Sequence, residues 1–146
     1  MPKFNFKRFK FSYQAALSKD LSEMEDLMED TELSIENLYS RYDHPYNNSD
    51  YQYELLQLYS NTKTKIREYE DHATELSAEL LNEKEAGRVS EDFFKDVQTD
   101  IEVVLNQCLT YQIQIEILYA KYRGAKKIDL NIDLEDRKIS MTTMES

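Results

Sequence analysis

The sequence predicts an all-α fold, an antiparallel three-helix coiled-coil bundle with extended N- and C-terminal tails. The 146 residues include only two glycines and two prolines, too few for a turn-rich β fold. Hydrophobic residues make up 40% of the chain, too many for a disordered protein, and they recur at alternating three- and four-residue steps. A length of 146 residues is typical of one domain. No apolar stretch reaches the roughly 18 residues of a membrane-spanning helix, so we expect no membrane span.

Turn-forming residues divide the chain into three helical segments. A proline and two asparagines interrupt the pattern between Tyr42 and Ser49, and a second interruption contains Gly87. These breaks predict helices at about 13–42, 49–87 and 90–124, together a bundle of residues 13–124, with an arm at 1–12 and a tail at 125–146. Ser49 and Ser90 are the expected N-caps of the second and third helices, and Gly124 is expected to end the third.

Each segment carries one heptad seam of core residues. The seams are Leu17, Leu21, Met24, Met28, Thr31, Ile35, Leu38 and Tyr42; Leu55, Tyr59, Thr62, Ile66, Tyr69, Ala73, Leu76 and Leu80; and Phe94, Val97, Ile101, Val104, Cys108, Tyr111, Ile115, Leu118 and Tyr122. Folding the seams at the two turns places Leu17 beside Leu80. Thr31 and Cys108 then share one layer, and Thr62 falls in the next.

The third segment has a second apolar row in addition to its seam. Its members are Leu105, Leu109, Ile113 and Ile117, each four residues from the last. Such a row is either the sign of a more deeply buried helix or a face for self-association or a partner.

The N-terminal arm is basic and aromatic and contains no acid. Its candidate interaction residues are Phe4, Phe6, Lys7, Arg8, Phe9, Lys10 and Phe11. An arm of this kind suits an acidic protein groove, an anionic membrane surface or nucleic acid, or it docks on its own domain. The net charge of −11 on the whole chain argues against nucleic acid as a partner, because the phosphates would be repelled.

The C-terminal tail contains a strand-like segment at 127–135. Its apolar residues alternate with polar ones: Ile128, Leu130, Ile132 and Leu134. A calcium loop is excluded because Leu134 and Ser140 stand where an EF-hand needs glycine and glutamate. With no other strand predicted, we expect the segment to pair outside its own tail, for instance with the basic arm of another molecule.

The first helical segment is strongly acidic. Eight carboxylates and no cation occur between Asp20 and Ser40. The candidate acidic face consists of Glu25, Asp26, Glu29 and Asp30. It is either a solvated surface or a docking surface for a basic partner.

The residues for an enzyme site are missing. Cys108 lies on a seam, where burial raises the pKa of a thiol, and neither His44 nor His72 belongs to a metal-binding pattern. The two isolated glycines do not form a phosphate-binding loop. We therefore expect no catalytic residue, metal or cofactor.

These features favour a non-enzymatic, self-associating helical assembly or scaffold protein. Prohead core proteins of tailed phages are similar in being small, acidic and helical, which implies a viral structural or core component of a particle. The expected location is cytoplasmic, or the host cytoplasm or particle interior if the protein is viral. The alternative is an acidic inhibitor or adaptor, such as a nucleic-acid mimic, that binds a partner protein through its first helix.

Overall fold

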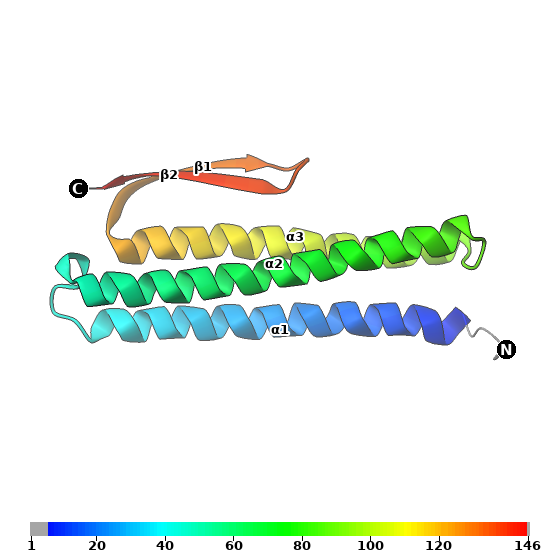
Figure 1. The fold of residues 1–146 in the computed structure, drawn as a ribbon, viewed down its shortest axis with the longest axis horizontal. Coiled ribbons are helices and arrows are strands. Elements are labelled where there is room, and N and C mark those ends of the chain that lie inside the picture. Colours follow the sequence, from blue (N-terminus) through cyan, green and yellow to red (C-terminus); the bar gives the residue numbers. More distant parts are fainter. Residues whose placement is uncertain (1–5, 146) are drawn as a thin grey trace. The chain divides into compact units, whose positions relative to one another are not determined.

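Three long α-helices pack against one another in an antiparallel bundle, and a small antiparallel sheet follows them (Figure 1). The computed structural model describes residues 6–145, including the side chains of residues 12–127, 129–140 and 142. The elements are α1 (Phe6–Ser40), the 3-10 helix η1 (Pro45–Asn47), α2 (Ser49–Glu85), α3 (Glu91–Arg123), β1 (Ala125–Asp133) and β2 (Lys138–Glu145). The predicted antiparallel three-helix bundle is confirmed.

The bundle consists of two compact units, each assembled from parts of all three helices. The first unit combines the N-terminal segment up to Met24 with Arg67–Cys108, and the second combines Glu25–Ile66 with the chain from Leu109 onward. All residues of the three predicted seams are buried or half-buried. The largest fully buried side chains are Leu17, Met24, Leu80, Val97, Ile101 and Val104 in the first unit, and Ile35, Leu38, Tyr51, Leu55, Ile66 and Ile115 in the second.

The register of α1 against the other helices differs from the predicted one. In the first unit, Asp20 Oδ2 lies 2.5 Å from His72 Nδ1, and the Cys108 Sγ lies 3.6 Å from the Met24 Sδ. The predicted register placed Cys108 beside Thr31, one heptad further along the first helix. That prediction was wrong because α1 ends before the predicted boundary and the chain reverses around η1.

A buried hydroxyl pair joins α1 to α2 in the second unit. The Oγ1 atoms of Thr31 and Thr62 are 2.8 Å apart, and both side chains are buried. The predicted register separated the two threonines into neighbouring layers, each with aliphatic neighbours. The shift of α1 brings the hydroxyls together, so each has a hydrogen-bonding partner inside the core.

The N-caps of α2 and α3 show one confirmed prediction and one correction. Ser90 Oγ accepts the backbone N–H of Phe93 at 3.0 Å, which confirms Ser90 as the cap of α3. At the start of α2, Asn48 Oδ1 accepts the N–H of Tyr51 at 3.0 Å. The cap is therefore Asn48 and not Ser49, because the asparagine side chain already satisfies the donor in the first turn.

The N-terminal arm is helical where the structure describes it, not extended as predicted. The α1 helix begins at Phe6, seven residues before the expected start. From residue 3 to the end of α1 there is neither glycine nor proline to stop a helix, and adding turns to an existing helix is less costly than starting one. Residues 1–5 lie outside the described residues.

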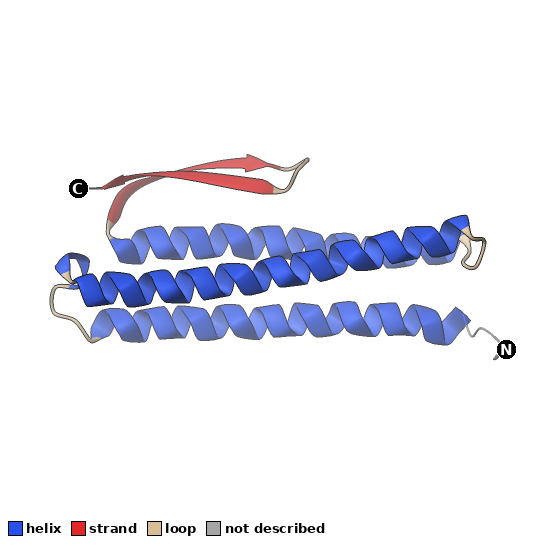
Figure 2. Ribbon diagram, in the orientation of Figure 1, coloured by secondary structure: helices blue, strands red, loops and turns tan. Residues whose placement is uncertain are grey.

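The C-terminal tail forms a β-hairpin and not a single strand (Figure 2). Strand β1 pairs with β2 in an antiparallel register that sets Leu130 opposite Met141 and Asp133 opposite Lys138. The prediction that the strand has no partner within its own tail is therefore wrong. The residues after the turn supply the second strand, whose isoleucine and threonines favour extended backbone.

Candidate functional site

The hairpin carries exposed aliphatic side chains next to a well-defined turn. Asp133 Oδ1 accepts the backbone N–H groups of Glu135 at 3.0 Å and Asp136 at 3.1 Å. Ile132 is 38% exposed and Leu134 is 75% exposed. Two of the predicted interaction residues are thus accessible to a partner.

Both strands of the hairpin are edge strands in the part of the chain that the structure describes, because the sheet has two strands only. An edge presents unpaired N–H and C=O groups that can hydrogen-bond to another strand. Of the other predicted interaction residues in β1, Leu130 is half-buried, and the side chain of Ile128 lies outside the described residues. The hairpin edges are therefore candidate surfaces for β-strand pairing.

The second apolar row of α3 runs from the core to the surface. Leu105 and Leu109 are buried, Ile113 is half-buried, and Ile117 is exposed. The burial of the first two residues favours the interpretation that this helix is deeply buried. The row does not form one continuous outer ridge, and Ile117 is its accessible end.

The predicted basic-aromatic contact residues of the arm are not described as side chains. Phe4 lies outside the described residues altogether. For Phe6, Lys7, Arg8, Phe9, Lys10 and Phe11 the structure gives the backbone, which belongs to α1, and no side chain. Their role as an interaction site stays a prediction.

The acidic run of α1 contains two kinds of carboxylate. Asp20 and Glu23 contact side chains of α2 and belong to the structure of the first unit. The others are exposed, and no cation pairs with them among the described residues: Glu25, Asp26, Glu29, Asp30, Glu32 and Glu36. The predicted acidic face therefore exists as an accessible cluster of like charges in the second unit.

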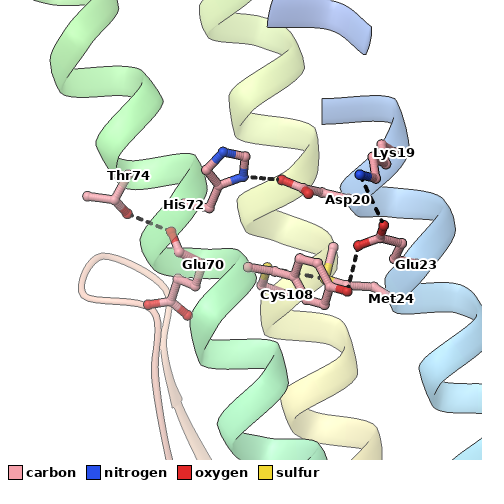
Figure 3. A network of polar contacts seen from close by, with 9 residues as sticks. Lys19, Asp20, Glu23, Met24, Glu70, His72, Thr74 and Cys108 are labelled. Atoms are coloured by element: carbon pink, nitrogen blue, oxygen red, sulfur yellow. Dashed lines mark hydrogen bonds and ion pairs between the residues drawn. The ribbon is translucent and has the colours of Figure 1, made fainter. Parts of the chain in front are cut away.

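Figure 3 shows the polar contacts that join α1 to α2 in the first unit. Asp20 is buried and points toward His72, whose side chain is 44% exposed. Glu23 accepts a hydrogen bond from the Tyr69 hydroxyl at 2.9 Å and lies 3.7 Å from the Lys19 ammonium. The buried Asp20 carboxylate needs such a partner, so its contact with His72, together with the Tyr69–Glu23 hydrogen bond, holds α1 against α2.

The thiol of Cys108 lies in the core below this network. Its Sγ contacts the Met24 thioether (Figure 3), and burial, together with the negative charges of Glu70 and Asp20, raises the pKa of Cys108 to about 12. A thiol with such a pKa stays protonated at neutral pH. Cys108 therefore acts as a small apolar core residue.

A second polar cluster, which the sequence pattern did not predict, lies in the second unit. Lys63 Nζ is 2.8 Å from Glu116 Oε1 and 3.0 Å from the Tyr59 hydroxyl, which itself donates to Glu116. Burial lowers the pKa of Lys63, but its hydrogen bonds to Glu116 and Tyr59 outweigh this and raise it. Tyr59 also stacks on Tyr119, with ring centroids 4.2 Å apart. Each polar group of the cluster is partnered within the chain.

A group of tyrosines that the sequence pattern did not predict lies around the turn between α1 and α2. The Tyr39 ring lies 5.5 Å from Tyr122, 6.0 Å from Tyr46 and 6.2 Å from Tyr51. The Tyr51 hydroxyl donates to the Tyr122 carbonyl at 2.5 Å. The signal was present as a concentration of tyrosines between positions 39 and 53, but aromatic pairing across helices depends on a register that the sequence did not predict correctly.

Within residues 6–145, none of the helices has both the length and the apolar character needed to cross a membrane. The side chains that the structure describes include no group of three or more histidine, cysteine or carboxylate residues that could hold a metal ion. Comparison with known proteins gives no further assignment, because no family, no curated protein and no solved structure matches the chain.

Proposed function

We propose that this chain is a self-associating helical assembly protein, and that its C-terminal hairpin is the contact between copies. The observation that carries the proposal is a two-stranded sheet whose two edges are open among the described residues, with exposed aliphatic side chains at Ile132 and Leu134. A two-stranded hairpin is marginally stable alone and gains from further strands or from packing. Pairing with another copy would supply those strands.

A role in a larger particle fits the rest of the chain. The helices are long and have buried heptad seams, and the polar clusters of both units have their partners within the chain. A scaffold or core component of a phage or other particle would use such an element together with a terminal contact. The host cytoplasm or the particle interior is the corresponding location.

The test is the molar mass of the full chain, measured by light scattering over a concentration series. We expect a mass that rises above the monomer value of 17.4 kDa with concentration. Replacing Ile132 by Thr and Leu134 by Ser should weaken the association, because both exposed aliphatic side chains are lost. Replacing Leu33 and Leu81, which are 57% and 44% exposed on helices, by Gln is the control and should leave the mass unchanged. A wild-type chain that stays monomeric at every concentration would refute the proposal.

A second candidate function rests on the acidic face. Its carboxylates are exposed and without cations among the described residues, as expected for a docking surface that receives a basic protein. An inhibitor that mimics nucleic acid would displace duplex DNA from a bacterial histone-like protein. This displacement should weaken with salt, and it should disappear when Glu25, Asp26, Glu29 and Asp30 are replaced by their amides.

A further inference from the structure

Strand β1 is chemically different on its two faces because apolar and polar residues alternate along it. Leu130 and Ile132 alternate with Asp129, Asn131 and Asp133. Asp129, Asn131 and Asp133 are exposed, and so is Lys127 at the start of the regular ladder. Between Asp129 and Asp133 the hairpin register continues both rows across β2, with Ile139 opposite Ile132 and Ser140 opposite Asn131. A strand added to the free edge of β1 must match an aliphatic row on one face and a charged row on the other.

A second copy of β1 meets this requirement in one antiparallel register, centred on Leu130. Leu130 then lies opposite itself, and Ile128 lies opposite Ile132. On the polar face, Lys127 lies opposite Asp133, and Asp129 lies opposite Asn131. Because the arrangement has twofold symmetry, each of these pairs occurs twice except Leu130 with itself, which lies on the axis and occurs once.

Neighbouring registers are less favourable. Centring on Asp129 sets that carboxylate opposite itself, and centring on Asn131 sets Asp129 opposite Asp133. Like charges directly opposite each other destabilise a strand pair. A shift by a single residue would place aliphatic side chains of one strand beside charged side chains of the other. A centre nearer either end leaves fewer residues paired.

We infer that β1 pairs with β1 of a second copy about Leu130, joining two hairpins into one four-stranded antiparallel sheet. The inference rests on the proposed self-association and specifies its interface. A bulge between Ala125 and Lys127 interrupts the regular ladder at one end, and the turn after Asp133 ends it at the other. The contact is isologous and finite, so it makes a closed dimer.

The first test changes the charge of Asn131, which faces Asp129 of the other copy in this register. Asn131→Lys creates two opposite-charge pairs and should tighten the dimer by about tenfold, whereas Asn131→Asp creates two like-charge pairs and should weaken it by about as much. The same changes at Asn61, an exposed residue of α2, are the control for net charge. They should leave the dissociation constant nearly unchanged.

The second test restores pairing by mixing two defective chains. The variant Asn131→Asp carries acids at positions 129 and 131, and the double variant Asp129→Lys with Asn131→Lys carries bases there. Each alone places like charges opposite each other, but a mixed dimer places opposite charges at all four positions. We expect two chains that associate weakly alone to form a heterodimer when combined.

The third test reports the register independently of charge. Directly opposite residues of antiparallel strands have Cα atoms about 4.5–5.5 Å apart, within the range of a disulfide. Leu130→Cys should therefore cross-link to itself under mild oxidation, while Ile139→Cys on β2 should not. Cys108 is fully buried and does not compete.

The outcomes separate the inferred register from the proposed function. A wild-type chain that remains monomeric refutes self-association itself. If the wild-type chain is dimeric, three results would overturn the register alone: equal effects at Asn131 and Asn61, no heterodimer on mixing, or equal cross-linking at Leu130 and Ile139. Pairing through β1 is supported if Asn131→Lys tightens the dimer, the two defective variants form a heterodimer on mixing, and Leu130→Cys cross-links to itself.

Discussion

At the scale of single residues, the Thr31–Thr62 hydroxyl pair allows the contribution of a buried hydrogen bond to the stability of the core to be measured. Replacing Thr31 by Val leaves the Thr62 hydroxyl buried without its partner, which costs about 1–3 kcal/mol. Replacing both threonines by Val removes both polar groups and should recover much of that loss. Urea unfolding of the two single variants and the double variant measures the coupling. Additive losses would mean that the hydroxyls do not depend on each other.

Buried tyrosines make stability fall at alkaline pH. Burial, followed by the charges of Glu79 and Glu83, raises the pKa of Tyr13 to about 12. An unfolded tyrosine has a pKa of about 10, so the unfolded chain loses this proton first as pH rises. The stabilising contribution of the neutral phenol is therefore present below pH ~10 and lost between pH ~10 and ~12.

The unfolding free energy should accordingly decline over that interval, and Tyr13→Phe should make the decline less steep. Tyr53 is 64% exposed, so Tyr53→Phe is the matched control and should leave the slope as it is. Urea unfolding at a series of alkaline pH values gives the slopes. Identical slopes for Tyr13→Phe and the wild type would show that the Tyr13 phenol makes no pH-dependent contribution to stability.

At the scale of the elements, Gly124 controls the passage from α3 into the hairpin. Its φ is +93°, and a Cβ added there would lie 3.0 Å from two ring atoms of Tyr46. Gly87 ends α2 with φ of +73° and has open space around it. Gly87→Ala should cost about 1 kcal/mol from backbone strain alone, and Gly124→Ala should cost more because the Tyr46 ring must also move. Equal losses in thermal or urea unfolding would contradict the close contact with Tyr46.

The helices could be predicted from the sequence because their signal is periodic and repeated. Every seam position, from Leu17 to Tyr122, is buried or half-buried in the structure. The second strand was missed because its pattern is weak. Between Lys138 and Glu145 the apolar residues are one isoleucine and two methionines, and the strand becomes recognisable only once a turn at Asp133 brings it beside β1.

Register and site geometry were less predictable because they depend on the ends of elements. Relative to the predicted register, α1 is shifted along α2 by about one turn. The shift places Thr31 beside Thr62 and Asp20 beside His72. The heptad pattern is nearly unchanged by such a shift, so periodicity cannot determine it. Asp20 therefore looked like one more solvated acid in the sequence, whereas in the structure it is buried and paired.

At the scale of the whole molecule, the distribution of charge should govern the response to salt. The chain carries a net charge of −11, and the acidic face concentrates four carboxylates in six residues of α1. Two of the like-charge pairs, Glu25 with Glu29 and Asp26 with Asp30, have the i, i+4 spacing that destabilises a helix by about 0.2–0.5 kcal/mol each. Raising the salt concentration screens this repulsion, since the Debye length falls from about 30 Å at 0.01 M to about 10 Å at 0.1 M.

The unfolding free energy of the wild-type chain should therefore rise between ~0.01 and ~0.5 M NaCl. Replacing the four acids of the face by their amides should raise stability at low salt by about 0.5–1 kcal/mol and flatten the salt dependence. A control that neutralises four separated acids, Asp43, Glu75, Glu85 and Glu135, removes the same net charge without relieving the cluster. If both variants respond equally, net charge alone is responsible. A larger effect at the acidic face would show that the folded chain keeps a repulsive cluster at a cost in stability, which is what a docking surface for a basic partner requires.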